Sequence, residues 1–299
     1  MKLHCVCLAL ATLLPVFDAL AGPTLDRVRA TRQVVIAYRE ASIPFSYVDA
    51  EGQPIGYAID LCKQLVDALS NQLGVGPLKI RYVPVTSSNR IETIEAERAD
   101  LGCESTTNTA ERRQRVSFTV PHYVTGTRFL VRADSPVVAL RDFAGRRLVS
   151  TTGTAPLDVL RSANAKHELG IRLGEVADHA RGVEAVARGE ADGFAMDEVL
   201  IQGLVAALPE PGRLKVVGKY LTVEALAIML PRNDAEFKGL IDSEMKRLIR
   251  NRTAHALHDR WFTQPIPPQG RNLNLPMPFL LRDSWRFPTD WVPPAWAMP

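Results

Sequence analysis

Residues 33–69 read QVVIAYREASIPFSYVDAEGQPIGYAIDLCKQLVDAL, and this stretch decides the fold class. Its first part, Gln33–Tyr38, is a run of β-branched and apolar residues that predicts a buried strand ending at Arg39. After a polar connection, Tyr57–Leu69 places apolar residues at helical spacing and predicts an amphipathic helix. A strand followed by a connection and a helix is the beginning of a βαβ unit.

The same alternation continues along the chain. Further strands are predicted at Lys79–Val85, Asp100–Cys103, Arg147–Ser150, Arg172–Val176 and Gly193–Met196, and further helices at Asn89–Ala99, Leu157–Lys166 and Arg181–Arg188. This order favours an α/β fold with mostly parallel sheets. The chain has 299 residues. Because single cores tend to stop growing at about 250–300 residues, we expect two lobes rather than one.

Composition and charge exclude several classes of protein. The chain carries 36 Lys and Arg against 33 Asp and Glu, and 46% of its residues are hydrophobic. These values are ordinary for a globular protein, so disordered and collagen-like chains are excluded. The net charge of +3 is small, and a nucleic-acid partner usually requires a concentrated basic face. We therefore expect no nucleic-acid partner.

The amino terminus has the organisation of a secretory signal peptide. Residues 1–21 read MKLHCVCLALATLLPVFDALA, with a positive start at Lys2 and an apolar segment over residues 3–16. Ala19–Ala21 is a small-residue cleavage site. The apolar segment is shorter than the roughly 20 residues that span a bilayer. We therefore expect export, cleavage before Gly22 and a soluble mature chain.

Four cysteines divide between the signal segment and the mature chain. Cys5 and Cys7 leave with the signal, and because neither follows a small-residue motif, a lipoprotein is the less favoured alternative. Cys62 and Cys103 remain, and in an oxidising compartment they could form a disulfide or stay as two buried thiols. The sequence has no CxxC pair and no His/Cys cluster, so no metal centre or other cofactor is expected.

Polar clusters follow the predicted strands. They are Tyr38-Arg39-Glu40, Thr86–Arg90, Glu104–Asn108, Thr151–Thr154, Asp178-His179 and Asp197-Glu198. Each alone is explained by a turn or a helix N-cap, and Pro156 suits the first turn of a helix. Parallel sheets, however, bind ligands at the carboxyl ends of their strands. The repeated hydroxyl, amide and arginine donors at these ends therefore indicate a site for a small anion.

The chain resembles the periplasmic amino-acid-binding proteins of ABC importers, the family 3 solute-binding proteins. The motifs that carry the resemblance are YRE, SIPFSY, GYAIDL, TSSNR, STTNTAERR, TGTA, the Asp-His pair, AMDE and WFTQPIPP. They extend from about Leu25 to about Asn274 and are most similar to the glutamate/aspartate-binding branch. The tail Arg282–Pro299, with Trp285, Trp291 and Trp296, is not covered by the resemblance. These aromatic residues could pack on lobe one or form a contact surface, and we expect packing.

The resemblance implies a two-lobed periplasmic-binding-protein fold of type II with two crossover hinge strands. We expect the crossings near Gly126–Val131 and Val223–Leu230. Lobe one is then formed by residues 22–127 plus 227–299, and lobe two by residues 128–226. A ligand is expected to lie between the two lobes.

The resemblance also assigns roles to residues. Arg112 is expected to pair with the α-carboxylate of an amino acid through both guanidinium nitrogens, assisted by Thr107, Thr154 and the amide of Ala155. Asp197 and Ser105 are expected to bind the ammonium, since a buried cation needs acceptors. The expected partners of a second, side-chain carboxylate are Arg39, Ser87, Arg90 and His179. His179 is expected to be neutral, because the site already holds three arginines.

Two positions depart from the family pattern. Ala155 stands where the branch usually has a second threonine after Gly-Thr, so one hydroxyl donor is lost. Cys103 occupies a position where relatives carry a cysteine, but the usual partner region reads Ala227-Ile228-Met229. Cys103 is therefore expected to be free or paired with Cys62.

The implied function is capture without chemistry. L-glutamate or L-aspartate is expected to close the lobes by a hinge motion, and the closed monomer to dock on an inner-membrane ABC permease. The chain has no GxxxxGK[ST] loop for nucleotide. Three alternatives remain: a binding protein for another polar amino acid, a sensor input module acting through a partner, and an exported cyclohexadienyl or arogenate dehydratase. In the last of these, Glu104 or Glu198 would be the general acid.

Overall fold

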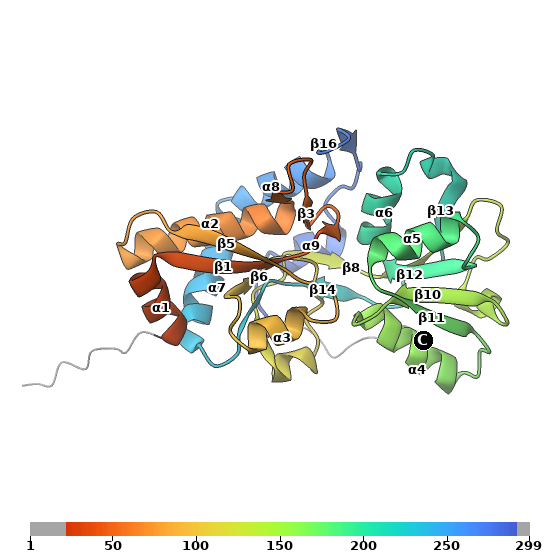
Figure 1. Cartoon of the computed structure of the whole chain (residues 1–299), viewed down its shortest axis with the longest axis horizontal. Coiled ribbons are helices and arrows are strands. Elements are labelled where there is room, and N and C mark those ends of the chain that lie inside the picture. Colours follow the sequence, from red (N-terminus) through yellow and green to blue (C-terminus); the bar gives the residue numbers. More distant parts are fainter. Residues whose placement is uncertain (1–21, 292–299) are drawn as a thin grey trace, which may run out of the picture.

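The structure is a computed structural model that describes residues 22–291, so the predicted signal segment 1–21 lies outside the described residues. Two separate five-stranded sheets divide these residues into two lobes (Figure 1). In lobe one the strands lie in the order β5 (Lys79–Pro84), β1 (Gln33–Tyr38), β6 (Leu101–Gly102), β15 (Met229–Pro231) and β7 (Val116–Phe118). β5, β1 and β6 are parallel, and β15 runs antiparallel to its neighbours.

Lobe two repeats this plan. Its strands lie in the order β11 (Arg172–Val176), β10 (Arg147–Thr151), β12 (Gly193–Asp197), β9 (Thr127–Arg132) and β13 (Leu214–Val217). β11, β10 and β12 are parallel, and β9 is antiparallel to β12 and β13. The α/β fold with two lobes and mostly parallel central strands is therefore confirmed.

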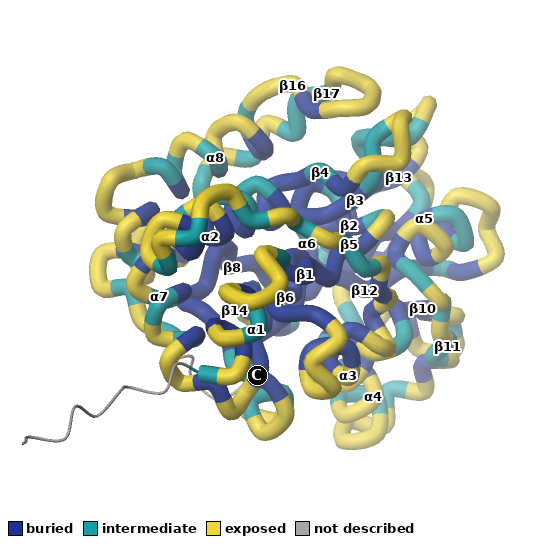
Figure 2. Tube along the Cα trace, turned by 60° about the vertical axis from the view of Figure 1, so that its left-hand side comes forward, coloured by how far each residue is buried: buried dark blue, intermediate teal, exposed yellow. Residues whose placement is uncertain are grey.

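Helices cover both sheets. The outward faces of the helices are exposed, whereas the strands are largely buried (Figure 2). Lobe one carries α1 (Pro23–Thr31), α2 (Tyr57–Leu73), α3 (Arg90–Glu95), α7 (Ala235–Arg250), α8 (Thr253–Phe262) and α9 (Phe279–Ser284). Lobe two carries α4 (Ala155–Lys166), α5 (His179–Ala187) and α6 (Glu198–Ala206). Within residues 22–291, none of these helices is long and apolar enough to cross a membrane.

Shorter elements complete the two lobes. They are β2 (Ala41–Ser42), β3 (Ser46–Val48), β4 (Pro54–Ile55), β16 (Pro265–Ile266), β17 (Arg271–Asn272) and the 3-10 turns η1 (Arg112–Gln114), η2 (Leu140–Phe143) and η3 (Pro211–Arg213). β2, β3 and β4 form a small antiparallel sheet directly after β1. This small sheet fills the connection that the sequence predicts between the first strand and α2.

The lobes are joined by two antiparallel strands, β8 (Tyr123–Thr125) and β14 (Glu224–Leu226). The sequence predicts crossing strands at 126–131 and 223–230. The structure instead divides each crossing into two short strands, β8 with β9 and β14 with β15. Gly126 lies at the first division, where a Cβ atom would be 2.3 Å from the carbonyl oxygen of Thr222. Only glycine therefore allows the two crossing segments to approach this closely.

All four predicted helices differ in extent from those observed, and α2 continues four residues beyond its predicted end at Leu69. The helix predicted over 89–99 is wrong in its second half, because α3 ends at Glu95 and Glu97 adopts a left-handed conformation with φ of 53°. α4 and α5 each begin two residues earlier than predicted. The start of α5 is fixed by Asp178, whose carboxylate accepts a hydrogen bond from the Arg181 amide at 2.9 Å. His179 is therefore the first residue of a helix.

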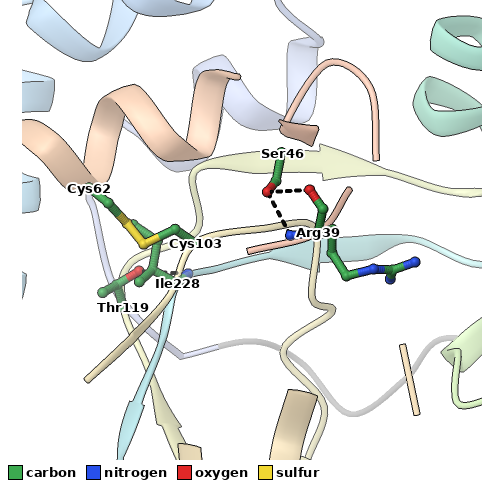
Figure 3. Close-up of a disulfide and its surroundings, with 6 residues drawn as sticks. All are labelled: Arg39, Ser46, Cys62, Cys103, Thr119 and Ile228. Carbon is green, nitrogen blue, oxygen red and sulfur yellow. Dashed lines mark hydrogen bonds between the residues drawn. A yellow bond between two sulfur atoms is a disulfide. The ribbon is translucent and has the colours of Figure 1, made fainter. Parts of the chain in front are cut away.

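Cys62 of α2 and Cys103 at the end of β6 form a disulfide (Figure 3). The sequence left pairing and free thiols open, and the structure resolves this in favour of the pair. Both residues are completely buried. The disulfide thus attaches α2 to the segment immediately before Ser105, which faces the gap between the lobes.

The tail beyond α8 returns to lobe one in part. Trp285 is buried, and its indole N–H donates to the carbonyl of Pro121 at 2.9 Å, just before β8. Lys238 of α7 forms an ion pair with Asp290 at 2.8 Å. Packing is therefore observed for Trp285, whereas the packing expected for Trp291 is wrong because this side chain is exposed. Trp296 lies outside the described residues.

An aromatic cluster surrounds two buried histidines beside the hinge strands. His122 contacts Phe45 and Tyr57, and His258 stacks on Tyr123. Both ring nitrogens of each histidine have no hydrogen-bond partner within the described part of the chain. Burial lowers the pKa of His122 to about 3 and that of His258 to about 4. Both rings are therefore neutral at pH 7.

These buried histidines predict acid sensitivity. The unfolded chain binds a proton at His122 near the ordinary pKa of about 6.5, whereas the folded chain binds it only near 3. Stability present above pH 6.5 is therefore lost as the pH falls towards 3, at up to about 1.4 kcal/mol per pH unit. Between about pH 7 and pH 5, we expect His122→Phe to lose about 2 kcal/mol less unfolding free energy than the unmodified chain.

Urea unfolding followed by circular dichroism at both pH values measures this difference. His167 is exposed, so His167→Gln is the matched control and is expected to keep the pH dependence of the unmodified chain. An equal loss of stability in His122→Phe and in the unmodified chain would contradict the role of the buried ring.

Candidate functional site

The polar clusters predicted at strand ends meet between the two lobes. In lobe one they follow β1, β5 and β6, and in lobe two they follow β10, β11 and β12. The lobes touch across this gap, since Arg112 donates to the carbonyl of Gly153 at 3.2 Å. The Ser88 hydroxyl donates to the Thr152 carbonyl at 3.5 Å. The structure therefore has the carboxyl ends of both sets of parallel strands facing each other, as the rule for ligand sites in such sheets requires.

A small cavity lies between these strand ends. It is lined by Arg90, Ser105, Thr107, Thr154, Ala155, Pro156, His179, Met196, Asp197 and Leu200. Seven of these belong to the set proposed from the sequence, and they come from both lobes. A small ligand in this cavity would contact both lobes at once.

The other three proposed residues, Arg39, Ser87 and Arg112, are not among those that line this cavity. Arg39 follows β1, and its guanidinium points towards lobe two (Figure 3) and donates to the Ser87 hydroxyl. The backbone of Arg39 is held by Ser46, whose hydroxyl oxygen accepts from the Arg39 amide at 2.8 Å. Arg112 donates to the carbonyl oxygens of Thr107 and Gly153, at 3.0 and 3.2 Å. Arg112 thus connects lobe one to lobe two.

Several buried polar atoms in this cavity have no hydrogen-bond partner among residues 22–291. They are Arg90 Nε, Ser105 Oγ, His179 Nε2 and Asp197 Oδ1. A buried polar group without a partner costs about 1–3 kcal/mol. A ligand with both acceptor and donor groups would satisfy this set, because the set itself mixes donors and acceptors.

His179 is held in a defined orientation. Its Nδ1 lies 2.8 Å from the Thr151 hydroxyl, which leaves Nε2 directed at the cavity. Burial, followed by the charges of Arg39 and Arg90, lowers the pKa of His179 well below its ordinary value. The ring is therefore neutral at pH 7 and is suited to a hydrogen bond rather than to an ion pair.

The three arginines differ in their charge partners. Arg90 forms a buried ion pair with Glu104, with Nη1 2.9 Å from Oε2, and the Thr106 hydroxyl donates to the other oxygen of Glu104. Arg39 and Arg112 form no ion pair in the described structure. Burial, followed by the charge of Arg90, lowers the pKa of each to about 10, so both stay charged at pH 7. The site therefore holds two guanidinium groups without a carboxylate partner.

Sequence reasoning missed Glu224 of β14. Its carboxylate accepts hydrogen bonds from the hydroxyls of Thr107, Thr127 and Thr222, at 2.6, 2.8 and 2.7 Å. Burial, followed by the charge of Glu224, raises the pKa of Asp197 well above its ordinary value. The only local signal was an isolated carboxylate in the otherwise apolar segment 221–230, which reads LTVEALAIML.

Comparison with known proteins matches this architecture. The family description "bacterial extracellular solute-binding proteins, family 3" matches residues 34–264. The L-glutamate/L-aspartate-binding protein of Pseudomonas aeruginosa is 36% identical over 276 residues, which cover 92% of this chain and 91% of that protein. The glutamate/aspartate import solute-binding protein of Salmonella typhimurium is 33% identical over 270 residues, covering 90% of this chain and 89% of that protein.

Solved structures show the same fold. A variant of the arginine-binding protein of T. maritima superposes with a TM-score of 0.70 at 22% identity, covering 79% of this chain and 98% of the other. An ancestral amino-acid-binding protein, described as a precursor of cyclohexadienyl dehydratase, superposes with a TM-score of 0.69 at 23% identity, covering 81% and 100%. At these identities the likeness concerns the fold.

Proposed function

Because the chain belongs to the bacterial extracellular solute-binding proteins of family 3, we propose that it captures an acidic amino acid, L-glutamate or L-aspartate, for an ABC importer. One observation carries this proposal. The cavity between the lobes is lined by buried hydrogen-bond donors and acceptors that have no partner in the described structure, and two arginines near it have no carboxylate partner there. An acidic amino acid supplies two carboxylates and one ammonium, which suits that set.

The contacts support one distribution of roles. Arg112 and the Ala155 amide at the start of α4 are proposed to hold the α-carboxylate. Thr107 and Thr154 are proposed to lie beside it, while their hydroxyls donate to Glu224 and to the Thr151 carbonyl. Asp197 and Ser105 are proposed to accept from the ammonium. The side-chain carboxylate is proposed to lie against Arg39, Ser87, Arg90 and His179.

Capture is proposed to close the lobes about β8 and β14. In this proposal lobe one is formed by residues 22–127 and 227–299, and lobe two by residues 128–226. The ligand favours closure through its contacts with Ala155, His179 and Asp197 of lobe two, since only contacts that differ between two states shift their equilibrium. The signal at residues 1–21 is proposed to send the chain to the periplasm, where the closed monomer delivers its ligand to a membrane permease.

An enzymatic function is less well supported, because both carboxylates that were candidates for a general acid are engaged elsewhere. Glu104 pairs with Arg90, and Glu198 accepts from Gln202 at 3.0 Å and Tyr220 at 2.6 Å. The relatives that cover about nine tenths of this chain are binding proteins by description. We therefore propose binding without catalysis, which consumption of prephenate or arogenate by the purified protein would contradict.

Arg39 provides the sharpest test of ligand class. It is 3% exposed and lacks a carboxylate partner in the described structure, so a neutral ligand would leave it unpaired, at a cost of about 3–5 kcal/mol. At about 1.4 kcal/mol per tenfold change in affinity, glutamate is expected to bind at least about a hundredfold more tightly than glutamine. Arg39→Met is expected to reduce this preference to less than about tenfold.

Calorimetric titration of glutamate, aspartate, glutamine and arginine into each protein measures the preference. Arg39→Met is preferable to Arg90→Met here, because loss of Arg90 would also leave Glu104 without its ion-pair partner. Arg141 is exposed on η2, so Arg141→Met is the matched control and is expected to retain the full preference. If the ratio of glutamate affinity to glutamine affinity were unchanged in Arg39→Met, the assignment of Arg39 to the side-chain carboxylate would be contradicted.

A further inference from the structure

Two buried carboxyl groups lie together where the lobes join, and one of them, Asp197, lines the cavity. Asp197 ends β12, and Glu224 belongs to the hinge strand β14. Each is 3% exposed. Thr127 of β9 brings them together, because it is the register partner of Asp197 while its hydroxyl donates to Glu224 at 2.8 Å. Two carboxylates this close in a dry environment repel each other, so one of them favours the protonated form.

Hydrogen bonding decides which of the two carries the proton. Both oxygens of Glu224 already accept from threonine hydroxyls, at 2.6–2.8 Å. These bonds stabilise the charged form of Glu224. Asp197 Oδ1, in contrast, has no partner in the described structure. The proton therefore belongs on Asp197.

The remaining charged and titratable groups around Asp197 do not reverse this preference. Arg90 of α3 and Arg112 of η1 favour its ionised form, and His179 of α5 lines the same cavity as a neutral ring. Burial and the charge of Glu224 outweigh the two arginines and raise the pKa of Asp197 well above its ordinary value. Arg90 is also partly neutralised by its ion pair with Glu104.

We propose that Asp197 is protonated in the ligand-free protein and loses this proton when the α-ammonium of an amino acid binds, so that Glu224 links ligand capture to proton release. The inference rests on the proposed function, which places the ammonium at Asp197. The O–H bond of the Asp197 carboxyl group breaks, and its proton passes to the buffer. The ammonium keeps its own protons and donates one hydrogen bond to the newly charged carboxylate.

The sign of the pH dependence follows directly. Because binding releases a proton, a higher pH favours the complex. Affinity is expected to increase about tenfold for each pH unit over the range in which free Asp197 is protonated, and to become independent of pH above that range. Glutamate and aspartate themselves do not titrate near neutral pH, so the dependence reports on the protein.

Calorimetry with glutamate tests the inference on the full mature chain. Titrations at about pH 6 in two buffers with different ionisation enthalpies give the number of protons released, which we expect to be about one per glutamate. A binding enthalpy that is the same in both buffers would overturn the inference while leaving amino-acid capture intact. Failure of both glutamate and aspartate to bind in any buffer would instead overturn the proposed function and this inference with it.

Matched variants identify the residue responsible. Glu224→Gln removes the neighbouring charge but keeps an oxygen for the threonine hydroxyls, so proton release is expected to fall to less than about half a proton per glutamate. Glu244 is equally buried at 3% exposure but lies on α7, where it pairs with Arg247 at 2.6 Å. Glu244→Gln is expected to release the same number of protons as the unmodified chain. Full proton release in Glu224→Gln would overturn the role of Glu224.

If Glu224→Gln does not fold, as judged by circular dichroism, the pH dependence of binding in the unmodified chain still tests the inference. Its glutamate affinity, measured from about pH 5.5 to about pH 8, is expected to increase with pH. An affinity that stays constant or falls over this range would overturn the inference.

Discussion

Arg112→Met is expected to weaken the binding of every α-amino acid, acidic or neutral, by at least about 30-fold. Arg112 connects the lobes by donating to the carbonyls of Thr107 and Gly153, and it has no carboxylate partner in the described structure. In the proposed complex it faces the α-carboxylate, which all amino acids share. Removing one partner of a buried, hydrogen-bonded charge pair costs about 2–5 kcal/mol, which is about 30-fold to several thousandfold in affinity.

Calorimetry with glutamate, aspartate and glutamine measures this loss. Arg113 is the next residue on η1 and is also partly buried, so Arg113→Met makes the same chemical change one position away. We expect Arg113→Met to bind as the unmodified chain does. Glutamate binding by Arg112→Met within about tenfold of the unmodified chain would show that the α-carboxylate lies elsewhere. Arg39→Met distinguishes the two proposed carboxylate sites, because it is expected to weaken the binding of acidic ligands only.

The sequence predicted the parallel strands well, because their patterns are local. β1 and β11 begin and end at the predicted residues. The apolar run of β1 predicts a buried strand whatever surrounds it, and β1 is buried beyond Gln33, whereas β11 is an edge strand that stays partly exposed. The helix predicted over 89–99 failed because its end depends on the backbone conformation of Glu97, which the apolar spacing does not encode. Such boundaries are set by local turns and by tertiary packing.

The candidate site was predictable for a topological reason. Ligand groups gather at the carboxyl ends of parallel strands, so the polar residues after each predicted strand could be collected without any coordinates. The electrostatic partners could not be collected in this way. Glu224 is 117 residues from Thr107 along the chain, and the ion pair of Arg90 with Glu104 depends on how the turns after β5 and β6 pack. The spacing of residues along the sequence does not predict such contacts.

The sequence also could not establish that Cys62 pairs with Cys103. Two cysteines in an exported chain permit a disulfide, but whether their Cβ atoms meet depends on the packing of α2 against β6. Trp285 and Trp291 illustrate the same limit of the sequence. Trp285 donates to the carbonyl of Pro121 and is buried, whereas Trp291, six residues later, is exposed.

A glycine in the middle of a lobe-two helix allows the two lobes to approach each other. Gly203 of α6 lies against Ile43, which belongs to the turn between β2 and β3 of lobe one. A Cβ atom on residue 203 would lie 2.3 Å from the carbonyl oxygen of Ile43, so the observed arrangement of the lobes does not leave room for it. Alanine is favoured over glycine within a helix by about 1 kcal/mol, so the substitution suits lobe two itself.

Gly203→Ala is therefore expected to oppose closure without damaging the fold. Glutamate affinity should fall about 10- to 100-fold, because contacts with His179 and Asp197 form fully only when the lobes close. The unfolding free energy without ligand should stay unchanged or rise slightly. Gly239→Ala makes the same change in helix α7, where nothing lies within 4 Å of the new Cβ, and is expected to bind normally. Calorimetry and urea unfolding of both variants measure these effects, and unchanged glutamate affinity in Gly203→Ala would show that capture does not require this approach of the lobes.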